Sequence, residues 1–273
     1  MKARLSPWLK ALIGAALTLT ALWGGKELAK LLVGSRFAEG TDPGTLSGAA
    51  RQVYLYFESV TSVMAYMLGL TVCLFVRDTV GKDGKSANLR LLMLLPAGVM
   101  LGAGLVKLLI DLDVIRREKA APEAGAYIAL VLIPLRCWLR ELLCRNVLQK
   151  GLSGKNSILA TAVSATVSAL MFVLIPGRLS VTGAANGLLL GLIGALVYDR
   201  TGSWMPMALL DTGFCLGVSL DGFINRSSLY RVGDEIFSGN LSLIYDGLGL
   251  TLILAAMTAL LIISRRPKKK IRT

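Results

Sequence analysis

The charged residues whose spacing suits chemistry lie in one apolar stretch, RCWLRELLCRNVL, which runs from Arg136 to Leu148. Glu141 and Arg145 are four residues apart, a spacing that brings two side chains together on a helix. A paired carboxylate and guanidinium offset much of the free-energy cost of burying either charge alone. Arg136 and Arg140 form a second stripe with no acid at helical spacing. We therefore expect these two arginines to contact water, lipid phosphate or a carboxylate from another segment.

A second acid lies in a later apolar stretch, LLDTGFCL, where Asp211 and Cys215 are four residues apart. Cys144 follows Glu141 by three residues, so each acid shares a helix face with a cysteine. These four groups are chemically able to bind zinc, which accepts carboxylate and thiolate ligands. Glu141 and Asp211 are also the type of carboxylate pair that shares a proton in aspartic proteases, although the neighbouring Arg145 argues against that arrangement.

Histidine, the side chain best suited to general-base catalysis near neutral pH, is absent from all 273 residues. Any hydrolytic site would therefore depend on carboxylates and thiols. The cysteines lie in apolar stretches and form no Cys-x-x-Cys motif, which favours free thiols that pack as small hydrophobic side chains. They are Cys73, Cys137, Cys144 and Cys215.

The elements that carry these residues are long apolar blocks. The chain is 54% hydrophobic and 17% charged, with a mean hydropathy of +0.64, and soluble domains are usually more polar. A helix needs about 20 apolar residues to cross a bilayer. We therefore predict an all-α, polytopic transmembrane helix bundle with about eight spans. The predicted spans are residues 7–24, 53–76, 91–110, 125–144, 157–176, 181–198, 203–221 and 245–264.

The net charge of +13 is distributed as in a membrane protein, because the basic residues cluster between the apolar blocks and in the tail RRPKKKIRT. This pattern predicts a multi-pass protein of the cell membrane with both termini in the cytoplasm. The tail is also suited to contact with anionic lipid. The bilayer is thus the expected partner, and nucleic acid is not.

Small residues recur four apart within two of the predicted spans. Gly98 and Gly102 occur in AGVMLGAG, and Gly187 and Gly191 occur in GLLLGLIG. This spacing allows helices to approach closely inside a membrane. We interpret both pairs as helix-packing positions.

Two of the apolar stretches resemble motifs of the CAAX-protease and bacteriocin-processing (CPBP, or Abi) family of intramembrane metalloproteases. RELLCRN, residues 140–146, is similar to the family motif Glu-Glu-x-x-x-Arg, in which Gly usually follows the Arg. Glu141 and Arg145 are kept, whereas Arg140 stands at the first Glu. SALMFVLIP resembles the Phe-x-x-x-His segment, with Phe172 kept and Pro176 at the position of the His.

The third motif of this family, His-x-Gly-x-Asn, is similar to LLDTGFCL. Gly213 is kept, whereas Asp211 and Cys215 stand at the His and Asn positions. The segment YDRTGSW before it also resembles the family. The resemblance covers roughly residues 125–221. It divides the chain into N-terminal helices (1–124), a CPBP-like core (125–221), and an outer loop, last span and basic cytoplasmic tail (222–273).

The resemblance implies that the catalytic positions of the family have all changed. In the family, the first Glu and the second-motif His are thought to activate water, and the third-motif His and Asn to stabilise the oxyanion. Arginine remains protonated above about pH 12, so it cannot act as a general base. Proline has no side-chain donor or acceptor. The retained Glu141 and Arg145 are expected to have an architectural role.

We therefore expect a catalytically degenerate member of the family, a pseudoprotease that binds or regulates a membrane protein or peptide. It would need no metal and no other cofactor, and it would not be an enzyme. The alternative is an active intramembrane endopeptidase that cleaves CAAX-like or bacteriocin-type peptides, using zinc or another divalent metal, or a carboxylate pair. A transporter has little support, because no paired broken helices or repeated polar stripe occur.

The reciprocal change of charge suggests one specific contact. Arg140 stands where the resemblance expects an acid, and Asp211 stands where it expects a base. A swapped salt bridge between them would offset the burial cost of both charges.

Overall fold

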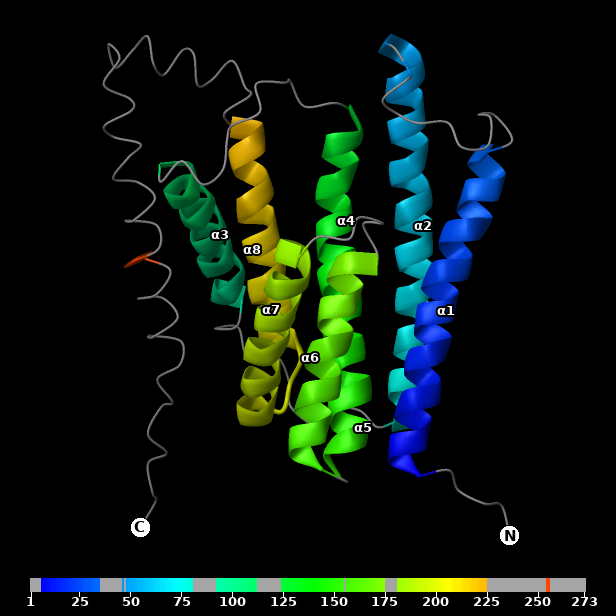
Figure 1. Ribbon diagram of the computed structural model, residues 1–273, viewed down its shortest axis with the longest axis vertical. Coiled ribbons are helices and arrows are strands. Elements are labelled where there is room, and N and C mark those ends of the chain that lie inside the picture. Colours follow the sequence, from blue (N-terminus) through cyan, green and yellow to red (C-terminus); the bar gives the residue numbers. More distant parts are fainter. Residues whose placement is uncertain are drawn as a thin grey trace. The chain divides into compact units, whose positions relative to one another are not determined.

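The computed structural model describes residues 6–34, 46, 48–80, 92–111, 124–154, 156–174, 181–224 and 254–255. Within these residues every regular element is helical (Figure 1), so the all-α prediction is confirmed for them. The longer elements are α1 (Pro7–Gly34), α2 (Gly48–Val80), α3 (Leu94–Asp111), α4 (Ala124–Glu141), the π-helical η2 (Leu142–Gln149), α5 (Lys150–Ser153), α6 (Ser157–Leu174), α7 (Val181–Thr201) and α8 (Met205–Ile224). The predicted span 245–264 lies almost entirely outside the described residues, and the number of spans stays a prediction.

The chain divides into two compact units. The first contains residues 1–86 and 123–208, and the second contains residues 87–122 and 209–273. In the first unit α1 packs on α2, α2 on α4, and α6 on α7, while η2 contacts α1, α2, α4, α5, α6 and α7. All eight residues of η2 are buried. This segment, which carries LLCRN of the motif RELLCRN, is therefore the centre of the first unit.

The apolar core of the first unit gathers around η2 and the end of α4. Leu139, Leu142, Leu143 and Leu148 are buried there against small and aromatic side chains of α1 and α2. The cysteines within the described residues are free thiols. Cys144 belongs to this apolar core, as expected of a thiol that packs as a small hydrophobic side chain.

The helical run that starts with α4 continues beyond its predicted end at residue 144. It passes through η2 and α5 to Ser153. The Lys150 N–H bonds to the carbonyl of Arg145, five residues earlier, which is the π-helical pattern. Apolar side chains of η2 face α1 and α2, whereas its polar side chains bond to α6 and α7. Because both faces are buried, the helix extends past the apolar block visible in the sequence.

In the second unit, α3 and residues 209–224 of α8 approach closely through glycines. A Cβ added to Gly98 would overlap the Leu210 carbonyl oxygen, and one added to Gly213 would overlap the Leu95 carbonyl oxygen. Gly102 and Gly217 meet the facing backbone in the same way. The packing prediction is therefore confirmed for Gly98 and Gly102.

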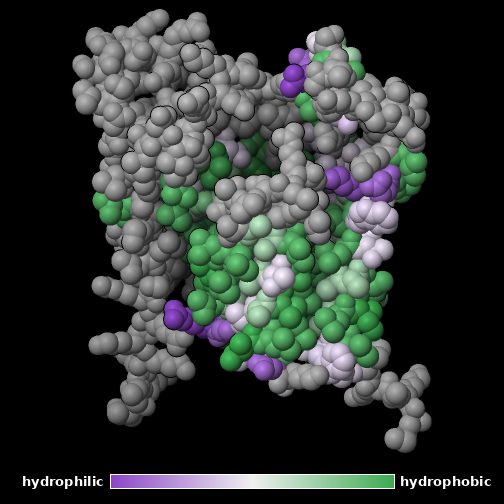
Figure 2. Space-filling view, viewed as in Figure 1, coloured by the Kyte–Doolittle hydropathy of each residue, from purple (hydrophilic) through white to green (hydrophobic). Residues whose placement is uncertain are grey.

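Apolar surface is extensive on the described helices. Two segments are long and apolar enough to cross a membrane, and three shorter helices are apolar along their length. The two long segments are Pro7–Leu28 and Gly48–Val80, and the three shorter helices are Leu94–Val106, Ser157–Met171 and Met205–Ser219. On the face drawn in Figure 2, most of the described surface is hydrophobic. Phe75 and Ile158 are exposed by 75% and 79%, which suits contact with lipid better than contact with water.

Candidate functional site

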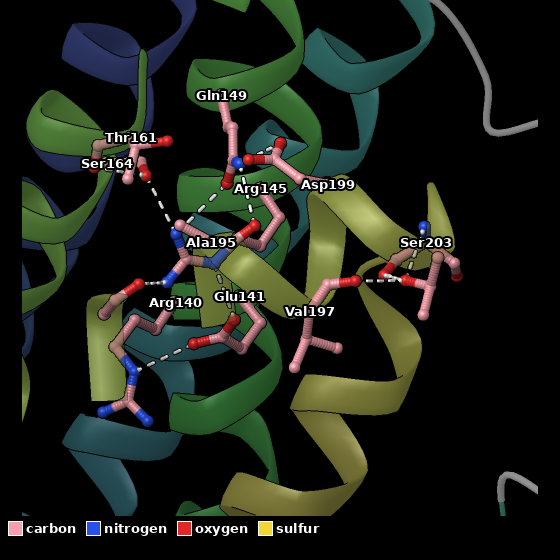
Figure 3. Close-up of polar contacts among 12 residues, drawn as sticks. Arg140, Glu141, Arg145, Gln149, Thr161, Ser164, Ala195, Val197, Asp199 and Ser203 are labelled. Atoms are coloured by element: carbon pink, nitrogen blue, oxygen red, sulfur yellow. Dashed lines mark hydrogen bonds and ion pairs between the residues drawn. The ribbon is translucent and has the colours of Figure 1, made fainter. Parts of the chain in front are cut away.

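The site forms around a buried carboxylate that lies between two guanidinium groups (Figure 3). The Nε of Arg145 donates to Oε2 of Glu141 over 3.1 Å. The Nε of Arg140 lies 3.6 Å from the other oxygen, Oε1. All three side chains are buried. The predicted Glu141–Arg145 pair is confirmed. Glu141 also lies within reach of Arg140, the residue directly before it, and this contact did not follow from the spacing of residues on a helix.

Arg145 joins η2 to two other helices. One terminal nitrogen, Nη1, donates to Gln149 Oε1 over 3.3 Å and to Ser164 Oγ of α6 over 2.8 Å. The other, Nη2, donates to the Gly191 carbonyl of α7 over 2.6 Å. A Cβ added to Gly194 would lie 2.6 Å from Nη2 and 2.9 Å from Nε. Gly194 therefore leaves the space that the guanidinium occupies.

Gln149 extends this network along α7. Its Nε2 donates to the Ala195 carbonyl over 3.1 Å and to Asp199 Oδ1 over 2.8 Å. Glu141 of α4 and Arg145 and Gln149 of η2 thus form a polar stripe at intervals of four residues (Figure 3), and Arg145 and Gln149 bond to α6 and α7. Gln149 was not predicted, although its interval of four residues from Arg145 is visible in the sequence.

Gly191 and Ser164 belong to the contact between α6 and α7. A Cβ added to Gly191 would lie 2.9 Å from the Ala165 Cα and 3.0 Å from its carbonyl oxygen. The close approach predicted for Gly191 is therefore confirmed. Nothing in the sequence distinguished Ser164 from other serines of the same apolar block.

In the second unit, Asp211 and Cys215 lie on one face of α8, as their spacing predicted. The Sγ of Cys215 is 3.8 Å from Oδ1 of Asp211, and Asp211 is fully buried. Gly213, the residue between them, packs against Leu95 of α3. The retained glycine of the third motif is thus explained by helix packing.

The remaining predicted residues are less informative. Phe172 lies within α6, and Pro176 lies outside the described residues. Arg140 belongs to the first unit and Asp211 to the second. The swapped salt bridge between these two therefore stays a prediction.

The surroundings of Glu141 disfavour a divalent cation, which the family resemblance would place near this motif. One carboxylate oxygen accepts a hydrogen bond from Arg145, and the other faces Arg140. Two guanidinium groups repel a metal ion and compete for the same lone pairs. Cys144, a further member of the predicted ligand set, lies in the apolar core. The surroundings of Glu141 and Cys144 therefore do not fit a metal.

One more polar side chain of η2 is notable. Asn146 is fully buried, and neither its amide nitrogen nor its amide oxygen has a hydrogen-bond partner in the part of the chain that the structure describes. It follows Arg145, at the position where the resemblance expects Gly. A buried amide without hydrogen bonds is destabilising.

The chain is thus a helical protein whose Glu-x-x-x-Arg motif forms a buried ion-pair cluster at the centre of a helical unit. Residues 122–213, about a third of the chain, match the family model described as type II CAAX prenyl endopeptidase Rce1-like. The predicted resemblance to the CPBP family is confirmed over this segment. No curated protein and no solved structure gives a significant match.

Proposed function

We propose that this protein is a multi-pass protein of the cell membrane with the CPBP fold, whose protease site no longer catalyses and instead binds or regulates a membrane protein or peptide. The supporting observation is the position of Glu141 between Arg140 and Arg145. Eight spans with both termini in the cytoplasm remain part of this proposal.

The chemistry of the cluster supports the loss of catalysis. Arg140 stands at the position of the family's water-activating Glu, and its guanidinium cannot accept a proton. The retained Glu141 has both oxygens next to guanidinium groups and is fully buried. A general base must instead be within hydrogen-bonding reach of a water molecule and able to take its proton.

The surface supports the membrane part of the proposal. Long apolar helices and exposed large apolar side chains, such as Trp23 and Phe75, occur on the described helices. Lipid tails would cover such residues without the free-energy cost that they carry in water. The match to an Rce1-like family model agrees with this location. Nucleic acid is not a proposed partner.

The test uses protein purified in detergent, incubated with a quenched fluorescent CAAX-type peptide with and without a prenyl group. We expect no bound metal at stoichiometric amounts by mass spectrometry and no cleavage above buffer. A family member with both motif histidines serves as the positive control. Cleavage that Glu141→Ala abolishes would overturn the proposal.

The alternative, an active endopeptidase, has one observation in its favour. Asp211 Oδ1 and Cys215 Sγ are 3.8 Å apart, so two of the four predicted metal ligands are already adjacent. The same purified sample tests it. Stoichiometric zinc that is lost in Asp211→Asn would favour the alternative.

A further inference from the structure

Basic residues that are far apart in the sequence meet at one end of the first unit. Gly151 of α5 packs on Ala11 of α1, because a Cβ added to this glycine would overlap the Ala11 Cβ. Lys150 and Lys10 are the residues directly before these two. The beginnings of α1 and α5 therefore lie side by side (Figure 1), and each brings a lysine to this end.

Two further contacts place an arginine of α2 and an arginine of α7 at the same end. A Cβ added to Gly14 of α1 would overlap the side chain that precedes Arg77, so the last turn of α2 lies beside the beginning of α1. Gln149 donates to Asp199 over 2.8 Å. This bond brings the last turn of α7, which contains Arg200, next to the beginning of α5. Both arginines therefore lie where α1 and α5 begin.

The four basic residues, called the basic end here, are Lys10, Arg77, Lys150 and Arg200. Two acids accompany them in the described helices. Asp78 lies 3.8 Å from the Nε of Arg77, and Asp199 precedes Arg200. Four cations against two anions leave an excess of two positive charges. Arg200 is exposed, and the other three basic residues are partly exposed. The basic end is therefore open to contact with a negatively charged partner.

Large apolar side chains are exposed directly beside the basic end. Ile13 of α1, Phe75 of α2 and Leu196 of α7 are all exposed, and each lies two to four residues from a basic residue of the same helix. On the face drawn in Figure 2, hydrophilic residues occur along the lower edge of the hydrophobic surface. Apolar helix surface that ends in basic residues is typical of the boundary between a bilayer and water, because the long stems of Lys and Arg pack on apolar surface while their charges reach the headgroups.

We infer that the basic end binds the headgroups of anionic phospholipids at one surface of the bilayer. The inference rests on the proposed membrane location, and it adds the class of lipid and the part of the protein that binds it. The excess of positive charge favours an anionic headgroup, since each Lys or Arg near an anionic lipid surface strengthens binding about fivefold. The adjoining apolar side chains favour a lipid over a soluble anion, because acyl chains cover them. The proposed topology places this end in the cytoplasm, where the membrane surface is negatively charged.

The test titrates the purified, delipidated full chain in detergent with two phospholipids that have the same acyl chains. Phosphatidylglycerol carries a net negative charge, whereas phosphatidylcholine is neutral overall, and native mass spectrometry measures the dissociation constant of each. We expect phosphatidylglycerol to bind about fivefold more tightly, the effect of one basic residue. Raising the concentration of ammonium acetate should weaken this preference, because salt screens exposed charges. Glycerol phosphate, which has the charge without acyl chains, should not bind at the same concentrations.

A pair of double variants assigns the preference to the basic end. Lys10→Gln with Arg200→Gln removes two of its cations, so the two phospholipids should then bind within about twofold of each other. Lys26→Gln with Arg51→Gln is the matched control, because it removes the same charge from the second half of α1 and the beginning of α2. The control should keep the preference for phosphatidylglycerol. Circular dichroism checks that both double variants keep their helices.

The outcomes separate this inference from the proposed function. Equal affinity for the two phospholipids, or the same preference in both double variants, overturns the inference and leaves the proposed membrane location intact. Glycerol phosphate that binds as tightly as phosphatidylglycerol also overturns it, because the basic end would then bind a soluble anion. Binding of neither phospholipid would overturn the proposed membrane location as well. Cleavage of the CAAX-type peptide, which is measured separately, would overturn only the proposed loss of catalysis.

Discussion

Replacing Arg145 with Met tests whether the buried guanidinium holds the first unit together. The change keeps a long side chain and removes four hydrogen bonds. Ser164 would still donate to the Thr161 carbonyl over 3.2 Å, and the Gly191 carbonyl lies inside α7, where backbone hydrogen bonds continue. These two groups therefore contribute little to the loss.

The larger loss arises at Glu141 and Gln149. Removing one partner of a buried ion pair costs about 3–5 kcal/mol, and leaving Gln149 Oε1 without its donor costs about 1–3 kcal/mol. Arg140, at 3.6 Å, compensates part of the charge on Glu141. We therefore expect Arg145→Met to lower the free energy of unfolding by about 3–5 kcal/mol, a large share of the 5–15 kcal/mol typical of proteins.

The assay is reversible unfolding of the purified protein in mixed micelles with increasing dodecyl sulfate, followed by tryptophan fluorescence. Trp138 of α4 and Trp204 form an edge-to-face pair with ring centroids 6.2 Å apart, so the signal reports on the end of α4. Lys150→Met is the matched control, because Lys150 follows η2 directly and is only partly buried. Its effect should stay below about 1 kcal/mol.

A double-mutant cycle decides whether the ion pair is the cause. Glu141→Met leaves two buried guanidinium groups and should cost about as much as Arg145→Met. The double variant should cost less than the sum of the two single variants, because the second change removes a charge already left without its partner. Additive costs, or a loss below about 1 kcal/mol for Arg145→Met, would refute this reasoning.

Three further changes test the neighbourhood of the site. Asn146→Leu should raise the free energy of unfolding by about 1–3 kcal/mol in the same assay, since it removes a buried amide without hydrogen bonds; a decrease would mean that the amide has a partner such as water. Gly194→Ala should lower the free energy of unfolding by about 1–3 kcal/mol, because the added methyl group overlaps the guanidinium of Arg145. In the Arg145→Met background, where no guanidinium is present, Gly194→Ala should cause no such loss. Gly213→Val should separate α3 from α8 and lower the thermal midpoint, whereas Gly154→Val, at a position with open space, should change it little.

Much of the fold was readable from the sequence because apolar blocks and helical spacing are local signals. The predicted blocks from residue 7 to residue 221 each overlap an observed helix. The pairing of Glu141 with Arg145, and of Asp211 with Cys215, follows from intervals of four residues. The end of the helix at Ser153 did not follow, because residues 145–153 mix polar and apolar side chains, and the polar Arg145 and Gln149 are buried through their bonds to α6 and α7.

The contacts that cross between helices were not predictable in the same way. Ser164 and Gly194 contribute to the site only because α6 and α7 meet η2, and one sequence contains no signal for such a pairing. Gly194 lies only three residues after Gly191, which was predicted as a helix-packing position.

The retained half of the first motif has a structural explanation that does not require catalysis. Glu141 at the end of α4 and Arg145 and Gln149 of η2 form one polar stripe, in which Arg145 and Gln149 bond to α6 and α7. Losing this stripe would open the centre of the first unit, so the stripe is needed for folding whether or not water is activated nearby. Arg140 stands at the position where the resemblance expects the first Glu, and its Nε lies 3.6 Å from Oε1 of Glu141. The two residues of the motif that remain, Glu141 and Arg145, are therefore ones that the fold needs.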